Sequence, residues 1–273
     1  HTSGDLLLYP YGYTSNLPTP ENELFLGISE ELVSQNGFNN ILSSELYPAA
    51  GDSDDFMYGT IGTHEKIYAF TPEIGSSFWP PSSQIESIAK GMMYLNITAA
   101  KMVNNYAVAT DTSPLYVGNF SNLDFTFDLK RLGFSGDGNF TVSLNPISTN
   151  ISSVGAPVDF NNLEVLDILD GTIQYTLDAG ILAGEEISFE LVINNGTYDS
   201  SILVTKYFGS LIPVFEDSGN SVTANFDNNG WGVTSSTFVS PSSSITESPS
   251  GNYPNNSSKS ITLLDEVDLT DAI

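Results

Sequence analysis

The residues best suited to chemistry lie in four short stretches near the start of the chain: HTSGDLLLYPYGY, ELYPAAGDSDDFMYG, KIYAFTPEIG and SSFWPPSSQI. They contribute a histidine, His1, a tyrosine, Tyr47, and carboxylates that include Asp54 and Glu73. An imidazole can bind a metal ion or transfer a proton, and a carboxylate can act as a general base. Each residue also has an ordinary explanation, because a lone histidine is more often structural and a glutamate after a strand is usually surface charge. Joint chemistry therefore requires a fold that brings these residues together.

Strand and helix signals are mixed in the first part of the chain and predict an α/β arrangement with a mixed sheet. The apolar run Leu6–Tyr9 is typical of a buried strand that is covered on both faces. We expect residues 67–70 to form the neighbouring strand. One helix is predicted to begin at an N-cap, Ser29. A second, over residues 83–105, has a capping box at Ser83 and an apolar face that we expect to pack on the sheet.

The hydrophobic period changes from 3.6 to 2 near residue 107, which divides the chain into segments. After the α/β segment, residues 1–108, short alternating strands separated by turns predict an antiparallel β-sandwich over residues 110–208. Within it, apolar residues occupy every second position from 123 to 129. Residues 210–273 predict strands joined by Asn, Gly, Ser and Pro turns. We expect this third segment to be a truncated, jelly-roll-like β module.

The composition restricts the classes of partner. The 273 residues include 33 acidic and 7 basic ones, for a net charge of −26. Nucleic acid and anionic membranes would be repelled, because phosphate binding requires clustered Lys and Arg. No stretch approaches the ~20 apolar residues of a membrane span. The chain has no cysteine, which excludes disulfides and thiolate metal sites. An Asn-, Ser-, Thr- and Gly-rich surface that is poor in Lys and Arg is common in secreted bacterial proteins, so we expect an extracellular location.

Taken in order, the four stretches resemble the second half of the zinc metallocarboxypeptidase family, the carboxypeptidase A/B/T type. In that family a His-Ser/Thr pair precedes a LLLYPYGY-like strand, and a Tyr precedes a GxSxDWxY loop. The catalytic Glu follows an FTxE strand, and an FxxPxxQI turn enters the last helix. The match is colinear over residues 1–106, apart from an expanded YGTIGTHEK loop and Phe56 in place of Trp. More weakly, the second and third segments resemble accessory β modules of secreted bacterial peptidases, the third being MAM-like.

The resemblance implies a Zn²⁺-dependent hydrolase that removes C-terminal residues from peptides. His1 matches the third zinc ligand of the family. Glu73 matches the general base that takes a proton from zinc-bound water and passes it to the leaving amine. Tyr47 matches the mobile tyrosine that closes over the substrate and hydrogen-bonds it.

The resemblance also implies a specificity pocket. Asp54 matches the residue at its floor, and Leu8 and Thr71 match its walls. An acidic floor implies a preference for C-terminal Lys or Arg, because a buried carboxylate requires a cationic partner. The neighbouring Asp55 matches a position that is usually structural.

Two departures from the family leave a second hypothesis open. The family's first two zinc ligands come from a His-x-x-Glu motif, which neither His1 nor His64 begins, and Arg131 is the only arginine. We therefore expect this chain alone to bind zinc weakly and to be inactive. The first hypothesis is a portion of a secreted zinc carboxypeptidase. The alternative is a non-catalytic binding or adhesive β-sandwich protein, with modules that bind protein or carbohydrate. Calcium binding at acidic turns such as residues 216–217 and 227–229 is a further hypothesis.

Overall fold

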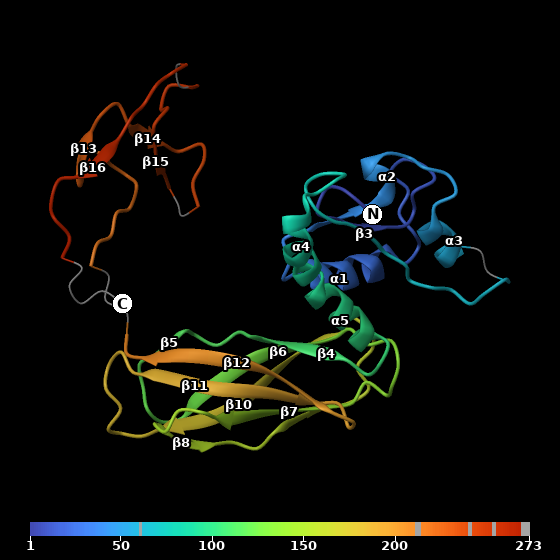
Figure 1. Ribbon diagram of the computed structural model, residues 1–273. Coiled ribbons are helices and arrows are strands. Elements are labelled where there is room, and N and C mark those ends of the chain that lie inside the picture. Colours follow the sequence, from blue (N-terminus) through green and yellow to red (C-terminus); the bar gives the residue numbers. More distant parts are fainter. Residues whose placement is uncertain (60–61, 211–213, 240–241, 253–254, 269–273) are drawn as a thin grey trace. The chain divides into compact units, whose positions relative to one another are not determined.

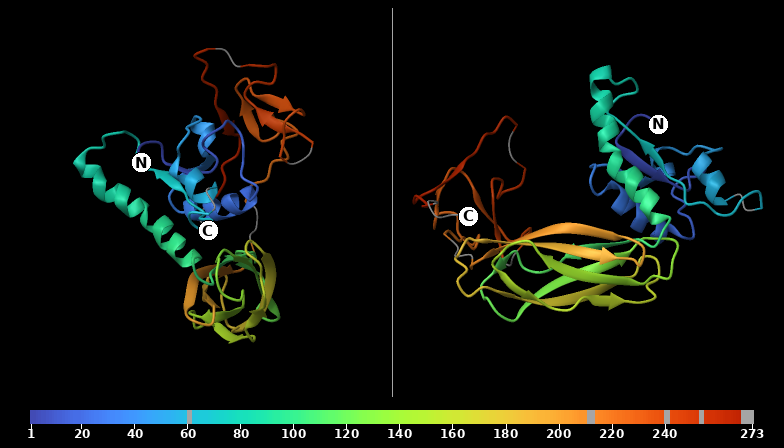
Figure 2. Two further views of the ribbon diagram at one scale, coloured as in Figure 1. Left: turned by 90° about the vertical axis from the view of Figure 1, so that its right-hand side faces the viewer. Right: turned by 60° about the horizontal axis from the view of Figure 1, so that its bottom comes forward.

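The computed structural model forms two compact units, His1–Phe208 and Gly209–Ile273, and each is described by itself (Figure 1). Within the first unit, a helical part with a small sheet precedes a larger part made of strands (Figures 1 and 2). No helix in the described part of the chain has the length and apolar character needed to cross a membrane. The structure describes all residues except 60–61, 211–213, 240–241, 253–254 and 269–273.

The small sheet is mixed and has the strand order β2-β1-β3. Its central strand, β1 (Leu6–Tyr9), pairs in parallel with β2 (Asn39–Leu42) and antiparallel with β3 (Thr71–Glu73). Leu7, Leu8 and Tyr9 are all buried. The apolar run therefore forms the central strand that it predicts, since such a strand is covered by neighbours on both edges and by side chains on its faces.

The predicted strand at residues 67–70 is wrong. Those residues have no strand structure, and the partner of β1 begins at Thr71. The rings of Tyr68 and Phe70 each pack against Phe25, with ring centroids 5.4 Å apart. Tyr68 also donates a hydrogen bond to Glu21, at 2.9 Å. Aromatic packing, rather than strand pairing, explains the apolar pattern at these positions.

Two helix predictions need correction. Ser29 is not an N-cap, because it lies buried inside the first helix and donates its hydroxyl to the carbonyl of Leu26. The helix predicted over residues 83–105 begins as a 3-10 turn with no side-chain cap and is divided at Met92, next to Gly91, a weak helix former. The helices are α1 (Asn22–Val33), α2 (Ser43–Leu46), α3 (Ser53–Gly59), η1 (Ser82–Gln84), α4 (Ile85–Gly91) and α5 (Met93–Met102).

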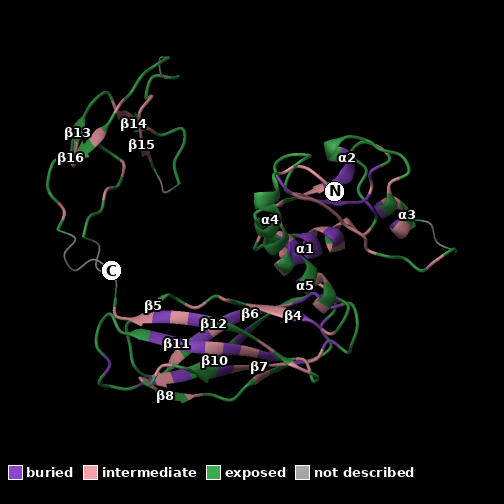
Figure 3. Ribbon diagram, in the orientation of Figure 1, coloured by how far each residue is buried: buried purple, intermediate pink, exposed green. Residues whose placement is uncertain are grey.

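The strand-rich part of the first unit contains two sheets that share one hydrophobic core. Their strand orders are β4-β6-β10-β8 and β5-β12-β11-β7-β9. All pairs are antiparallel except β5 with β12. Buried and exposed positions alternate along the strands, as period 2 predicts (Figure 3). The strands are β4 (Ala107–Asp111), β5 (Tyr116–Val117), β6 (Leu123–Arg131), β7 (Phe140–Pro146), β8 (Ile151–Val154), β9 (Val158–Phe160), β10 (Ile168–Leu177), β11 (Glu186–Asn194) and β12 (Asp199–Phe208).

The helical part and the two sheets meet around Leu132. This side chain is fully buried in a cluster with Leu7, Leu32 and Met102. The predicted segment boundary at residues 108–110 falls inside β4, and residues 1–208 pack as one compact unit. The three-segment division remains a prediction about domains.

The second unit has short strands in two separate pairs. β13 (Phe226–Asn228) pairs with β16 (Ile261–Leu263), and β14 (Gly232–Thr234) pairs with β15 (Ser244–Thr246). Among its described residues, no larger sheet forms. The jelly-roll-like character of this segment thus stays a prediction.

Candidate active site

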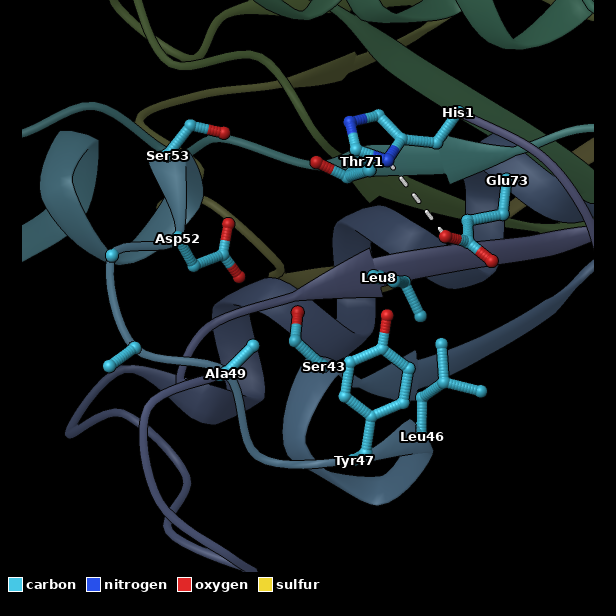
Figure 4. A pocket seen from close by; sticks show the side chains of 13 residues that line it. His1, Leu8, Ser43, Leu46, Tyr47, Ala49, Asp52, Ser53, Thr71 and Glu73 are labelled. Atoms are coloured by element: carbon cyan, nitrogen blue, oxygen red, sulfur yellow. Dashed lines mark ion pairs between the residues drawn. The ribbon is translucent and has the colours of Figure 1, made fainter.

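A pocket of about 380 Å³ lies at one end of the small sheet (Figure 4). His1, Leu8, Tyr47, Thr71 and Glu73 line it. These residues come from the start of the chain, from β1, from the segment after α2 and from β3. The fold therefore brings five of the six residues singled out in the sequence to one cavity.

Strand pairing positions one wall of the pocket. Leu8 of β1 is opposite Thr71 of β3 in the antiparallel register. Thr71 and Glu73 are two residues apart, so their side chains point to the same side of the sheet. His1 is held beside β3 through its backbone, because its carbonyl accepts the N–H of Ile74 at 3.0 Å.

His1 and Glu73 face each other in the pocket. The imidazole Nδ1 lies 4.0 Å from the carboxylate Oε1. The two side chains differ in accessibility, at 75% exposed for His1 and 12% for Glu73. A sheltered carboxylate beside an accessible imidazole provides a proton acceptor and a nitrogen ligand within reach of one small reacting group.

Tyr47 lies across the pocket from this pair. It follows directly after α2 and is 64% exposed. Its hydroxyl points into the pocket (Figure 4). An exposed ring on an irregular segment has room to change position, which is the property that the family's mobile tyrosine requires.

Asp54 is placed differently from the other predicted residues. It does not line the pocket, and it is only 4% exposed. Burial raises its pKa to about 6, although a hydrogen bond with the Thr71 side chain opposes that shift. Its Oδ2 atom has no hydrogen-bond partner among the described residues. Asp54 therefore lies behind the wall formed by Thr71.

Asp55 has a structural environment. Its two carboxylate oxygens accept the backbone N–H groups of Gly12 and Tyr13, at 2.8 and 2.9 Å. Burial raises the pKa of this carboxyl, and these two hydrogen bonds oppose the shift. The contacts connect α3 to the segment after β1 and support one side of the pocket.

Sequence reasoning missed three polar residues that line the pocket, namely Ser43, Asp52 and Ser53. Ser43 is buried and donates its hydroxyl to the carbonyl of Tyr9, at 2.9 Å. Asp52 adds a second carboxylate to the lining (Figure 4). The only sequence signal for Asp52 was its place in the acidic run DSDD.

The side chains of the pocket provide only part of the ligand set of a zinc centre. A catalytic zinc site uses three protein ligands, commonly His, Asp or Glu, and keeps one open position. His1 is a suitable ligand, but no group of three or more His, Cys, Asp or Glu side chains in the described part of the chain is placed to hold a metal ion. The described part of the chain also gives no support to calcium binding at residues 216–217 and 227–229.

Comparison with known proteins relates the N-terminal segment to one family. Residues 1–95 match the family model of the zinc carboxypeptidases. The resemblance of the N-terminal segment to this family is thus confirmed, and the family implies Zn²⁺.

Two similar proteins are carboxypeptidases by name. Carboxypeptidase B of Rattus norvegicus is 33% identical over 116 residues, 39% of this chain and 26% of the relative. A zinc carboxypeptidase of Saccharothrix mutabilis subsp. capreolus is 33% identical over 88 residues, 30% of this chain and 18% of the relative. The chain thus spans about a quarter or a fifth of the length of these two relatives.

Solved structures add no functional information. A FixG-related protein from Vibrio parahaemolyticus aligns with 39% of this chain and 96% of its own, at 11% identity and a TM-score of 0.26. A conjugative transposon lipoprotein from Bacteroides eggerthii aligns with 37% of this chain, at a TM-score of 0.25. Scores this low carry no argument about fold or function.

Proposed function

We propose that residues 1–95 contribute part of the active site of a zinc-dependent metallocarboxypeptidase, which hydrolyses C-terminal residues from peptides. The main support is the approach of His1 to Glu73, at 4.0 Å, in a pocket that Tyr47 also lines. The whole segment that forms this pocket lies within the match to the zinc carboxypeptidase family.

Each residue has a chemical task in this proposal. Glu73 is the general base, which accepts a proton from the attacking water and later delivers it to the leaving amine. Tyr47 donates a hydrogen bond to the bound peptide, and Leu8 and Thr71 contact the terminal side chain. His1 is one zinc ligand. Bound zinc would act as a Lewis acid. Because the described residues do not place three ligands together, we assign no step to the metal.

The proposed substrates are peptides that end in Lys or Arg. The support is Asp54, a buried carboxyl whose Oδ2 atom has no partner. A buried carboxylate without a partner is costly, and a cation beside it relieves that cost. Nucleic acid is excluded from the proposed partners by the net charge of −26.

A chimeric enzyme provides the test. Residues 1–95 would replace the matched segment of rat carboxypeptidase B, and release of the terminal residue would be followed on peptides ending in Arg and in Phe. We expect zinc-dependent hydrolysis with a preference for Arg. Glu73→Gln should lower kcat by about 10²–10⁴-fold, the usual contribution of a general base.

Two results decide the test. Glu65→Gln is the control, because Glu65 is exposed and does not line the pocket, so this variant should retain activity. A folded chimera that binds zinc but has no Glu73-dependent activity would contradict the proposal and favour a non-catalytic binding protein. The 273-residue chain itself is expected to release no terminal residue under the same conditions.

The strand-rich segments are proposed as accessory modules of a secreted enzyme. This extends the resemblance of residues 110–208 to a β-sandwich and of residues 210–273 to a jelly-roll-like module. Either module would bind protein or carbohydrate. Pull-down of the isolated segments with cell-surface polysaccharides and with substrate proteins, against a buffer control, tests this role.

A further inference from the structure

A buried ion pair joins the two sheets of the strand-rich part. Lys206 of β12 and Asp111, the last residue of β4, belong to different sheets. The Lys206 Nζ atom is in direct contact with the Asp111 Oδ2 atom. The side chain of Lys206 is 3% exposed and that of Asp111 is 22% exposed. This pair is more deeply buried than the other ion pairs among the described residues.

The burial of this pair is costly. The ring of Phe125, a residue of the hydrophobic core, lies 5.7 Å from the Lys206 nitrogen. The same nitrogen donates a hydrogen bond to the carbonyl of Ser113, at 2.8 Å. Two buried charges lose their hydration, and their mutual attraction offsets only part of that loss. An uncharged link between the two side chains would remove both charges from the interior.

The carboxylate of Asp111 is held in a way that polarises it. Its Oδ1 atom accepts two hydrogen bonds from Ser113, from the backbone N–H at 2.9 Å and from the hydroxyl at 2.6 Å. Donors directed at one oxygen stabilise the negative charge that develops there when a nucleophile adds to the carboxyl carbon. The Lys206 nitrogen lies against the other oxygen, one covalent bond from that carbon. The reacting groups are therefore already held together.

We propose that Lys206 and Asp111 condense to an amide, a covalent isopeptide cross-link between β12 and β4. A proton moves from Lys206 Nζ to Asp111 Oδ2, which gives a neutral amine and a carboxylic acid. The nitrogen lone pair then forms a bond to Cγ, and Oδ1 carries the negative charge, stabilised by Ser113. A second proton moves from the nitrogen to Oδ2, the Cγ–Oδ2 bond breaks, and one water leaves as the Oδ1 carbonyl forms again. Ammonium and carboxylate thus become amide and water, without an oxidant or a cofactor.

The cross-link would give this part of the chain the kind of covalent support that disulfides give elsewhere. The two residues are 95 positions apart, and the chain has no cysteine. A bond between distant residues lowers the conformational entropy of the unfolded chain, and so stabilises the folded one. This inference concerns the strand-rich part and does not depend on the proposed carboxypeptidase function.

The mass of the 273-residue chain tests the inference. The folded protein would be denatured and its intact mass measured. We expect a mass that is lower than the sequence mass by one water, and a peptic digest with a linked fragment that joins Asp111 to Lys206. Fragment spectra must locate the bond, because cyclisation of an Asp-Gly pair also releases one water, and Asp137 and Asp170 each precede a glycine.

Three variants show whether the bond involves these two side chains. Lys206→Arg keeps the positive charge, but a guanidinium stays protonated and does not act as the nucleophile. Asp111→Ala removes the carboxyl group, and both variants should have their full sequence mass. Lys66→Arg is the matched control, because Lys66 contacts Glu21 at 2.5 Å in a more exposed ion pair that water keeps charged. This control should lose one water, as the parent does.

Two results would overturn the inference. One is a folded parent protein, with dispersed amide signals, whose denatured mass equals the sequence mass; Lys206 and Asp111 would then form an ion pair alone. The other is a loss of water that persists in Lys206→Arg, or that the fragment spectra place at other residues. The measurements on the parent decide the question even if a variant fails to fold.

Discussion

The two parts of the first compact unit differ in what their side chains bury. The strands β4–β12 enclose an aromatic and aliphatic core in which Phe125, Phe127 and Phe189 are fully buried. The helical part buries polar groups such as Ser43 and Asp54 and leaves large apolar side chains exposed, including Trp79 at 93%. The strand-rich part also buries Arg131 and Lys206, but Arg131 donates to backbone carbonyls and Lys206 to Asp111. Asp54 in the helical part keeps one oxygen without a partner, and such a group reduces local stability.

The largest expected effect is in the core of the two sheets. Phe189 packs against the rings of Phe125 and Tyr175, with ring centroids 5.8 and 5.0 Å away. Phe189→Ala should lower the free energy of unfolding by about 3–5 kcal/mol, because it removes these contacts and leaves a cavity. Denaturant unfolding measures the change, and Phe120→Ala, at an exposed position, is the control. A similar loss from both variants would show that the sheets do not share a tight core.

The next effect tests whether the helical part has a core of its own. Leu95 of α5 is 6% exposed and packs in the cluster around Leu7, whereas Ile85 of α4 is 61% exposed. Leu95→Ala should cost about 2–4 kcal/mol, and Ile85→Ala less than about 0.5 kcal/mol. Hydrogen exchange of the β1 and α5 amides locates the loss. An equal loss of free energy of unfolding in both variants would instead support the continuous apolar face predicted over residues 83–105.

The buried carboxyl of Asp54 predicts a pH-dependent weakness in the helical part. Burial raises its pKa from 3.8 to about 6 in the folded protein. The protonated form is thus favoured by folding, so its stabilisation is full below pH 3.8 and is lost as the pH rises through about 6. Asp54→Asn mimics the protonated form and should raise the free energy of unfolding by about 2 kcal/mol at about pH 8.

The same variant should have little effect at about pH 3.5, where the parent is protonated as well. Urea unfolding at several pH values measures the difference. Asp170→Asn, at an exposed position of β10, controls for net charge. If Asp54→Asn raised the free energy of unfolding equally at every pH, ionisation of Asp54 would not be the cause of the increase.

The smallest expected effect is on the exposed surface of α4, which has no buried residue (Figure 3). Glu86 and Lys90 form an ion pair four residues apart, at 2.7 Å, and both side chains are largely exposed. Glu86→Gln should change stability by less than about 0.5 kcal/mol, because solvent and salt screen such pairs. Thermal unfolding in low and high salt checks this. A loss above about 1 kcal/mol would place α4 within the stable core.

The sequence by itself determined the elements whose patterns report burial directly. The apolar run of β1 and the alternation of β6 were predicted correctly, because a side chain's face follows from its position along a strand. His1, Tyr47 and Glu73 were selected by their match to a known family, and that similarity is confirmed over residues 1–95. Their catalytic roles remain proposals.

Only the tertiary structure decided how these residues meet. Residues 67–70 carry a strand-like pattern, but Tyr68 and Phe70 pack their rings on Phe25, a contact that no local pattern encodes. Pairing of β1 with β3 joins residues more than 60 positions apart and places Leu8 beside Thr71. Asp52 lines the pocket and Asp54 lies behind it. Asp52 caps the start of α3, where its Oδ1 accepts the backbone N–H of Asp54. The direction of a side chain at a helix end is set by the hydrogen bonds it makes there, and these form only once the fold has brought the backbone into position.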